Sequence, residues 1–225
     1  MSVDISAYPF KSQLDPSVSI GEKMFPGDSY KGIYNACISG ECKYVAKILP
    51  AENIHDFGDT EDYTFRDLAK NELIITKYMS EIGVGPIVHD MALTDTQAIL
   101  ILDKYDIDLL DLFMRYQYDK TIPMDKIMNT LGVLVYTMHK SGVVHCDLLL
   151  PNVFYREVDE KITIIDYGKS TFSDSKIVRE FDMKGLNAMF DVYYRIRNGE
   201  IIGEVNDFLD AVTLGGGYMN GKKYQ

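Results

Sequence analysis

The chain has 225 residues, of which 46% are hydrophobic and 25% are charged, the composition of an ordinary soluble globular protein. No apolar run approaches the roughly 20 residues that a membrane-spanning helix needs, and the start, Met1-Ser2-Val3-Asp4, lacks the features of a secretory signal. The formal net charge of −11 argues against non-specific binding to nucleic acid or to anionic membrane. It is compatible with a basic protein or a cationic small molecule as substrate, although a role in solubility alone is the simpler interpretation.

The number and spacing of the cysteines indicate the redox state of the compartment in which the protein works. Cys37, Cys42 and Cys146 form no metal-ligand pattern, and three cysteines cannot all pair with one another. A reducing, cytoplasmic setting is the simplest expectation.

The first hundred residues are predicted to form a small sheet. After a loop or short leading strand over 1–20, strands at 33–38 and 43–49 flank the turn Ser39-Gly40-Glu41, which is typical of a hairpin. An acidic stretch with Gly58, residues 53–62, is expected to be an exposed loop.

A single helix is predicted inside this sheet. Thr64 is a suitable N-cap with Asp67 three positions on, and apolar residues recur at helical spacing until Gly83 and Gly85-Pro86 end the pattern near residue 82. Strands follow at 87–93 and 98–102.

The pattern becomes helical beyond Asp103. Helices are predicted at 107–116, 124–140, 180–197 and about 202–213, with short strands at 153–155 and 161–165 and a glycine-rich tail. The sequence therefore predicts an α+β protein with two lobes, residues 1–103 and 104–225, that meet near Lys104-Tyr105-Asp106.

Two motifs point to chemistry. His145, Asp147 and Asn152 have the spacing H-x-D-x-x-x-x-N, and Asp166-Tyr167-Gly168 follows a run of β-branched residues. Phosphoryl transfer needs a positioned triphosphate, neutralisation of its charge by metal and cations, and an acceptor hydroxyl oriented toward a base. Carboxylate and amide oxygens can bind such a metal, and a carboxylate can act as such a base.

These residues resemble the protein-kinase-like superfamily, and the resemblance covers roughly residues 20–200. It implies a bilobal kinase fold, in which an antiparallel sheet with one helix forms the N-lobe and a shortened, mainly helical C-lobe carries the catalytic and metal-binding loops. It also implies ATP and Mg²⁺ as cofactors. The short chain is similar to minimal atypical kinases of the RIO-like and viral or bacterial-effector types.

The resemblance assigns roles to the motif residues. Asp147 matches the catalytic aspartate, which takes or orients the proton of the acceptor hydroxyl. Asn152 and Asp166 match the metal-binding pair, and their hard oxygen atoms suit Mg²⁺. His145 is expected to hold the loop by packing and hydrogen bonding.

The N-lobe half of the site is predicted from a strand lysine and a helix glutamate. Val45-Ala46-Lys47 resembles the family's V-A-I-K, with Lys47 reaching the α- and β-phosphates. Glu72 is the expected partner of Lys47, because Glu61 and Glu81 fall too near the ends of the helix.

Further nucleotide contacts are expected from the loop before the hairpin and from the hinge. The stretch 27–34 resembles the family's glycine loop, but its glycines are displaced by about one position and Lys31 occupies a usual glycine site. The predicted ATP-binding residues here and at the hinge are Gly27, Ser29, Tyr30, Gly32, Ile33, Lys104 and Tyr105.

Three departures from the family pattern are informative. Leu149 stands where main-group protein kinases have a phosphate-binding lysine, and Cys146 replaces the arginine that binds a phosphate on the activation segment. The activation segment is short and has no A-P-E element. Asp182 is expected to accept hydrogen bonds from the backbone of the catalytic loop. Cys146 is expected to be a small packing residue of that loop.

The predicted function is ATP-dependent phosphorylation of Ser or Thr hydroxyls on a protein substrate, which the negative charge would allow to be basic. Two alternatives stay open. One is a small-molecule kinase of the aminoglycoside or choline type, which Leu149 favours, although residues 103–144 leave no room for the usual helical insertion. The other is a non-catalytic pseudokinase. No nucleic-acid or membrane partner is expected, a viral or effector kinase would act in the host cytoplasm, and the sequence does not predict the oligomeric state.

Overall fold

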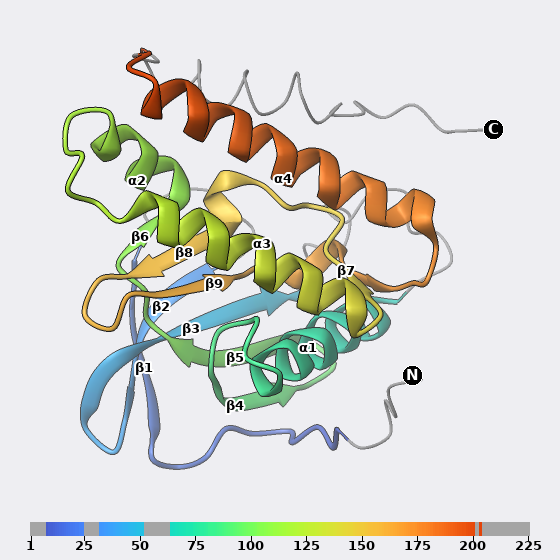
Figure 1. Cartoon of the computed structure of the whole chain (residues 1–225). Coiled ribbons are helices and arrows are strands. Elements are labelled where there is room, and N and C mark those ends of the chain that lie inside the picture. Colours follow the sequence, from blue (N-terminus) through green and yellow to red (C-terminus); the bar gives the residue numbers. More distant parts are fainter. Residues whose placement is uncertain (1–7, 25–31, 52–63, 201–202, 204–225) are drawn as a thin grey trace. The chain divides into compact units, whose positions relative to one another are not determined.

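A computed structural model describes residues 8–24, 32–51, 64–200 and 203 (Figure 1). The chain divides into two compact units, one formed by residues 1–105 and 165–171 and the other by residues 106–164 and 172–225. The sequence-based lobes were continuous segments, whereas the first unit also takes in the short stretch that carries Asp166. The expected loop at 53–62 lies outside the described residues, as does the expected helix at 202–213 apart from residue 203.

The first unit contains an antiparallel sheet of five strands in the order β1-β2-β3-β5-β4. Its β2–β3 hairpin turns at Ser39 and Gly40, whose φ angles of 51° and 85° are both positive, a conformation that glycine adopts without strain. The strands are β1 (Val18–Lys23), β2 (Gly32–Ile38), β3 (Glu41–Pro50), β4 (Val88–Leu93) and β5 (Gln97–Asp103).

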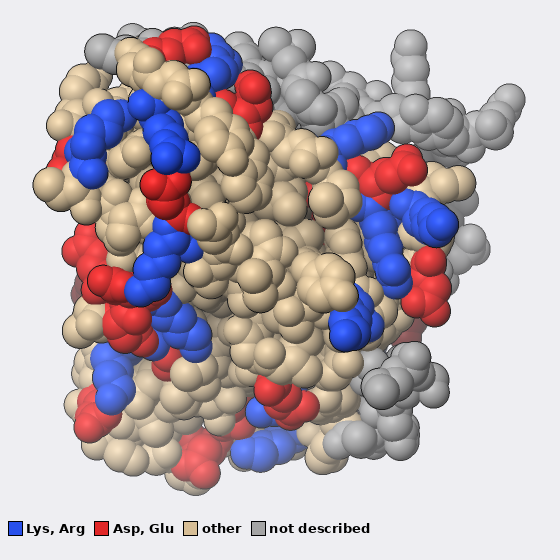
Figure 2. All heavy atoms as spheres, viewed as in Figure 1, with Lys and Arg blue, Asp and Glu red and all other residues tan. Residues whose placement is uncertain are grey.

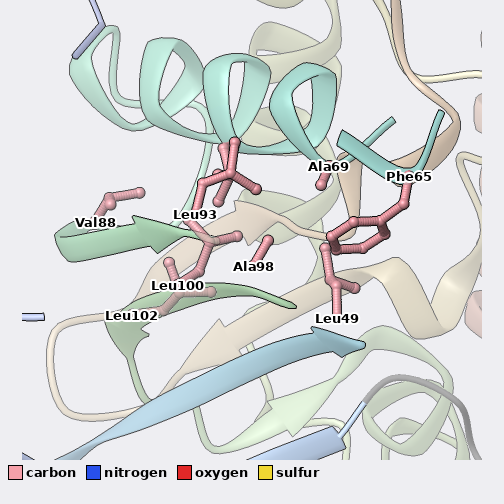
Figure 3. Packing of buried hydrophobic residues seen from close by; sticks show 9 residues of the cluster. Leu49, Phe65, Ala69, Val88, Leu93, Ala98, Leu100 and Leu102 are labelled. Atoms are coloured by element: carbon pink, nitrogen blue, oxygen red, sulfur yellow. The ribbon is translucent and has the colours of Figure 1, made fainter. Parts of the chain in front are cut away.

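Helix α1 (Phe65–Glu81) is inserted between β3 and β4, as the sequence predicted. A capping box fixes its start, because the Thr64 side chain accepts from the Asp67 N–H and the Asp67 carboxylate accepts from the Thr64 N–H. Apolar side chains of α1 pack on one face of the sheet (Figure 3); the cluster consists of Leu49, Phe65, Ala69, Leu73, Val88, Leu93, Ala98, Leu100 and Leu102.

The opposite sheet face is also apolar. Alternate residues of β5 point to the two faces, so Leu100 joins the α1 cluster while Ile99 and Ile101 join a second cluster with Ala46 and Ala36. This alternation fixes which side chains of β3 face α1.

The second unit is mainly helical. It contains α2 (Leu109–Tyr116), α3 (Met124–Lys140) and α4 (Lys176–Arg197), with β6 (Ile107–Asp108), β8 (Val153–Arg156) and β9 (Lys161–Ile164) forming a three-stranded sheet. Short elements at the catalytic motifs are β7 (Val143–Val144), η3 (Leu150–Asn152), η4 (Tyr167–Lys169) and β10 (Thr171–Phe172), of which η4 belongs to the first unit and β10 spans the boundary between the units.

Two helix starts differ from the predicted ones. Helix α2 begins at Leu109 rather than 107 because the Asp108 side chain caps it, accepting from the Asp111 N–H at 2.9 Å. Helix α4 begins at Lys176 rather than 180. Its N-cap Ser175 makes no side-chain capping bond and its first turn carries no acidic residue, so the usual signals of a helix start are missing.

One cysteine pair departs from the expectation of reduced thiols. Cys37 and Cys42 form a disulfide across the β2–β3 hairpin, with Cα atoms 4.0 Å apart. Cys146 is the free cysteine. The expected cytoplasmic setting therefore stays a prediction.

None of the helices that the structure describes is long and apolar enough to cross a bilayer. On the face shown in Figure 2, many lysine and arginine side chains lie close to aspartate and glutamate side chains. The expectation that the chain has no nucleic-acid partner stays a prediction.

Candidate active site

Strand alternation places Lys47 beneath α1. Lys47 pairs with Leu100 of β5 and shares its face of β3 with Leu49, and both of these leucines pack against α1. Glu72 lies on the buried side of α1 and is 1% exposed. The lysine of one element and the glutamate of another therefore meet.

Lys47 forms ion pairs with both predicted carboxylates. Its Nζ lies 2.5 Å from Glu72 Oε1 and 2.8 Å from Asp166 Oδ1. Burial by itself lowers the pKa of Lys47, but the charges of Glu72 and Asp166 outweigh it and hold the pKa above its ordinary value. The ammonium is therefore charged at every physiological pH, as a phosphate-binding group must be.

Asp166 has an unusual backbone. Its φ of 63° and ψ of 67° are left-handed, a conformation that costs a non-glycine residue free energy and persists where surrounding contacts enforce it. The next residue, Tyr167, is fully buried, and Asn71 Nδ2 donates to the Ser170 carbonyl at 2.8 Å. Helix α1 thus holds the Asp166 segment through Asn71 while its Glu72 holds Lys47.

The catalytic loop in the second unit is fixed by its own side chains. The Asp147 N–H donates to His145 Nδ1 at 3.3 Å, so that Nδ1 is the unprotonated nitrogen of this buried ring. Asn152 Nδ2 donates to the Asp147 carbonyl at 2.8 Å. Since a carbonyl can only accept, this bond also fixes which way the Asn152 amide points.

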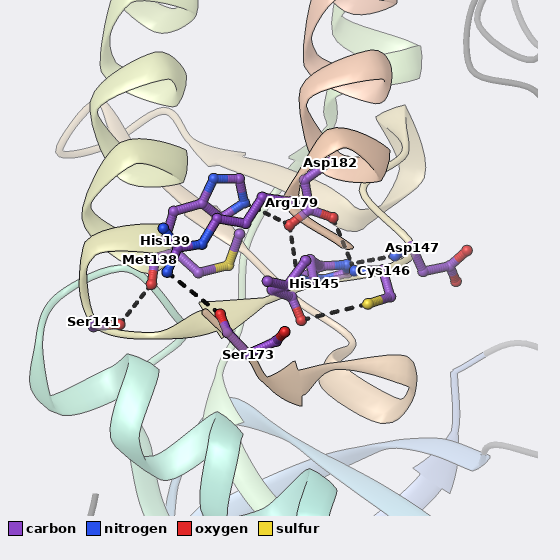
Figure 4. Close-up of polar contacts among 10 residues, drawn as sticks. Met138, His139, Ser141, His145, Cys146, Asp147, Ser173, Arg179 and Asp182 are labelled. Carbon is purple, nitrogen blue, oxygen red and sulfur yellow. Dashed lines mark hydrogen bonds and ion pairs between the residues drawn. The ribbon is translucent and has the colours of Figure 1, made fainter. Parts of the chain in front are cut away.

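Asp182 of α4 supports the same loop, as the sequence predicted. Its Oδ2 accepts from the His145 N–H at 2.7 Å and its Oδ1 from the Cys146 N–H at 2.8 Å. His139 Nε2 lies 2.9 Å from Oδ2 and acts as the donor, because a carboxylate accepts. Figure 4 shows this cluster, which satisfies a fully buried carboxylate with three donors.

Cys146 adopts a left-handed backbone with a φ of 62°. Burial, followed by the charges of Asp182 and Asp147, raises the pKa of its thiol to about 11. The thiol is therefore protonated at neutral pH, which agrees with its interpretation as a packing residue and not as a reactive thiolate.

Gly185, one turn after Asp182, lets α4 approach the loop. A Cβ built on Gly185 would lie 2.4 Å from the Leu148 carbonyl oxygen, closer than any real contact. Only glycine fits here.

The remaining predicted residues divide as follows. Gly32 and Ile33 open β2, Tyr105 is buried and Lys104 is exposed. Gly27, Ser29 and Tyr30 lie outside the described residues. The structure brings Lys47, Glu72 and Asp166 together in the first unit and Asp147 with Asn152 in the second; the ATP contacts and the Mg²⁺ ligands stay predictions.

The residues that hold a bound cation would need accessible hard oxygens. Asp166 uses Oδ1 for Lys47, and its side chain is 27% exposed. Asn152 donates its side-chain nitrogen to the Asp147 carbonyl, so its Oδ1 is the atom that would bind a metal. A carboxylate and an amide oxygen fit Mg²⁺, which prefers oxygen ligands and keeps part of its hydration shell.

Sequence reasoning missed four supporting residues: Asn71, His139, Arg179 and Gly185. Asn71 and His139 form hydrogen bonds with residues far away in the chain, and the role of Gly185 depends on helix packing, so no local pattern marks them. Arg179 contacts residues only five and six positions away, but these lie in a segment without a periodic pattern. Gly185 gave a weak signal, since a glycine inside a helical pattern can mark a close approach, although Gly132 of α3 has no close neighbour.

A sheet with one inserted helix, together with a helical unit bearing an H-x-D loop, defines the protein-kinase-like fold. A solved structure, "Structure of the Cydia pomonella Granulovirus kinase, PK-1", shares it with a TM-score of 0.59 and 19% sequence identity, over 90% of this chain and 76% of that chain. At this identity the likeness concerns the fold.

The particular family follows from the sequence. The model of the lipopolysaccharide kinase (Kdo/WaaP) family matches residues 82–201, more than half of the chain, and the chain belongs to that family. No curated protein sequence matches the chain. Membership of the protein-kinase-like superfamily is thereby confirmed and supports phosphoryl transfer as the activity. The matched residues contain Asp147, Asn152, Asp166 and Asp182, whereas Lys47 and Glu72 precede them.

Proposed function

We propose that the chain is an ATP- and Mg²⁺-dependent kinase that phosphorylates a hydroxyl group, with Ser or Thr of a protein as the first candidate acceptor. The observation that carries this proposal is the position of Lys47 between Glu72 and Asp166. A buried ammonium that contacts two carboxylates from separate segments is costly to desolvate. Phosphate binding gives a reason for that arrangement.

In the proposed reaction, Lys47 binds the α- and β-phosphates, and Glu72 keeps its ammonium in place. Asp166 and Asn152 would hold Mg²⁺, which neutralises charge on the phosphates when it is bound. These residues position the nucleotide and carry out no covalent step.

Asp147 acts on the acceptor. The acceptor oxygen attacks the γ-phosphorus, the bond from that phosphorus to the bridging oxygen of ADP breaks, and the hydroxyl proton passes to the Asp147 carboxylate. The backbone of Asp147 is held at its N–H by His145 and at its carbonyl by Asn152. This fixation supports its role, because a base must keep its orientation while the acceptor binds.

The absence of a long insertion between helices α2 and α3 of the described structure supports a protein as the phosphate acceptor. Small-molecule kinases of the aminoglycoside or choline type usually carry a long helical insertion, and here α2 and α3 occupy residues 109–140 with only residues 117–123 between them. The second candidate is a hydroxyl of a lipopolysaccharide sugar, which is favoured by the description of the matching family.

One experiment distinguishes these acceptors. The full chain is incubated with γ-labelled ATP and Mg²⁺, and with a generic basic protein in one arm and lipopolysaccharide in the other. Label on protein supports the first candidate, and label on lipopolysaccharide alone supports the second.

Two variants control the assay. Asp147→Asn should abolish transfer, and Asp191→Asn, at an exposed position of α4, should not change it. A wild-type chain that binds ATP in a thermal-shift assay but labels neither acceptor, nor itself, would favour the pseudokinase reading over the proposed enzyme.

A further inference from the structure

The segment that follows Asp166-Tyr167-Gly168 is held at Ser173. The Ser173 N–H donates to the Gly142 carbonyl at 2.8 Å, and the Ser173 carbonyl accepts from Arg179 Nη2 at 3.4 Å. Ser173 Oγ accepts from the Ser175 N–H at 3.1 Å. Gly142 directly precedes β7 and the catalytic loop, so these bonds tie the segment to the base of that loop.

Arg179 and the loop-holding Asp182 belong to the same helix. Arg179 lies in the first turn of α4, and Asp182 lies one turn further on, where it binds the N–H groups of His145 and Cys146. In Figure 4, Arg179 extends toward Ser173 while Asp182 faces the catalytic loop. The start of α4 therefore holds both segments through two adjacent side chains.

The second partner of Arg179 is Asp174. Nη2 lies 3.0 Å from Asp174 Oδ1, and the Asp174 side chain is 95% exposed while that of Arg179 is only 30% exposed. Arg179 Nε is buried and has no hydrogen bond among the described residues. An ion pair with an exposed carboxylate compensates poorly for desolvating a guanidinium, so stability alone is a weak reason for placing an arginine here.

The contact between Arg179 and Asp174 resembles the contact by which a phosphorylated residue orders a segment in kinases, since both pair an anion with an arginine. The added negative charge pairs with arginine and fixes the segment that carries it. In main-group protein kinases an arginine of the catalytic loop binds this phosphate, and Cys146 stands at its position in this chain. Arg179 instead reaches the segment from α4 and contacts the carboxylate of Asp174.

We propose that Arg179 is a positioning residue for catalysis, and that its pair with Asp174 fixes the segment 173–175 in the unmodified chain as a phosphate does elsewhere. The proposal rests on the proposed function, since it concerns the regulation of the same site. It implies that the kinase needs no phosphate on this segment to be active.

Hydrogen exchange of the full chain tests the structural half without any activity. In Arg179→Met, which also removes the bond to the Ser173 carbonyl, the Ser173 amide should exchange about tenfold faster than in the wild type, which corresponds to about 1.4 kcal/mol of lost local stability. In Asp174→Asn the increase should be smaller, about twofold to threefold, because solvent screens the exposed carboxylate. The charge-exchanged variant Asp174→Arg with Arg179→Asp should restore slow exchange. Arg195→Met is the matched control, because Arg195 of the same helix α4 forms an ion pair with Glu200, which lies beyond the end of the helix. This variant should leave the exchange of Ser173 unchanged.

Kinetics test the functional half on the acceptor found above. Arg179→Met should lower kcat about tenfold, and Asp174→Asn should lower it by a smaller factor, about twofold to threefold. Both variants should leave the KM for ATP unchanged, because neither residue belongs to the proposed nucleotide contacts. The charge-exchanged variant should recover kcat, and phosphatase treatment of the wild type should have no effect.

Three outcomes would overturn the proposal: wild-type exchange at Ser173 in Arg179→Met, unchanged kcat in both single variants, or loss of wild-type activity after phosphatase treatment. If the wild type transfers no phosphate to any acceptor, the proposed function fails on its own. The exchange measurements then decide whether Arg179 and Asp174 hold the segment.

Discussion

Lys47 and Glu72 form a buried ion pair, with Nζ 2.5 Å from Oε1 and with 7% and 1% of the two residues exposed. Neither oxygen of Glu72 has a hydrogen bond within the described residues, so the nearby ammonium is its compensating contact. Removing Lys47 leaves the fully buried Glu72 carboxylate without a compensating charge. Removing both leaves only Asp166 without its lysine, and the Asp166 side chain is 27% exposed to solvent.

We therefore expect Lys47→Met to lower the free energy of unfolding by about 3–5 kcal/mol, and Lys47→Met with Glu72→Leu to lower it by clearly less than the sum of the single changes. Urea denaturation measures both. Lys43→Met is the control, because Lys43 pairs with Glu41 at the exposed end of β3. Additive losses in the double variant would show that the two residues are not coupled.

Asp182→Asn should destabilise the catalytic loop. The substitution replaces one acceptor oxygen with an NH₂ group that cannot accept from His145 or Cys146, and we expect a loss of about 2–3 kcal/mol in the free energy of unfolding. Asp191→Asn on the exposed side of the same helix should change it by less than about 0.5 kcal/mol. If the two substitutions changed the free energy of unfolding equally, Asp182 would not have the proposed structural role.

Two helical glycines should respond to alanine with opposite signs. Gly132→Ala in α3 should stabilise the fold by about 1 kcal/mol, because a Cβ there meets nothing within 4 Å and alanine favours the helix. Gly185→Ala should instead cost about 1–3 kcal/mol, because its Cβ would meet the Leu148 carbonyl oxygen at 2.4 Å. Thermal unfolding compares the two, and a stabilising Gly185→Ala would mean that α4 does not pack on the loop this closely.

The thiol of Cys146 should react slowly at pH 8. Its pKa of about 11 lies above the ordinary value near 8.5, so the folded chain binds this proton more tightly than the unfolded chain. The stabilising contribution is complete below about pH 8.5 and is lost as the pH rises toward 11.

Iodoacetamide labelling against pH measures this shift. One free thiol per chain should react, because Cys37 and Cys42 are joined, and Cys146→Ser should abolish the signal. A labelling midpoint near the ordinary thiol pKa in the folded chain would contradict the burial of this group.

Local sequence determined most of the elements and most of the motif residues. The helix of the first unit begins at its predicted cap, since the Thr64–Asp67 box depends only on residues three positions apart. The strands at Val88–Leu93 and Gln97–Asp103 were likewise predicted, as short apolar segments on either side of the turn Thr94-Asp95-Thr96. Two-residue strands such as β7 and the uncapped start of α4 escaped prediction, because neither leaves a periodic pattern or a cap.

The sequence by itself also named Lys47, Glu72, Asp147, Asn152 and Asp166, because the motifs that carry them resemble those of the protein-kinase-like superfamily. Only the tertiary structure decided that Lys47 contacts both Glu72 and Asp166, and that Asp182 and Gly185 hold the catalytic loop. It alone joined Cys37 to Cys42 and placed Arg179 against Ser173 and Asp174. The physical reason is that these contacts depend on distances and burial set by packing, which residue spacing alone does not specify.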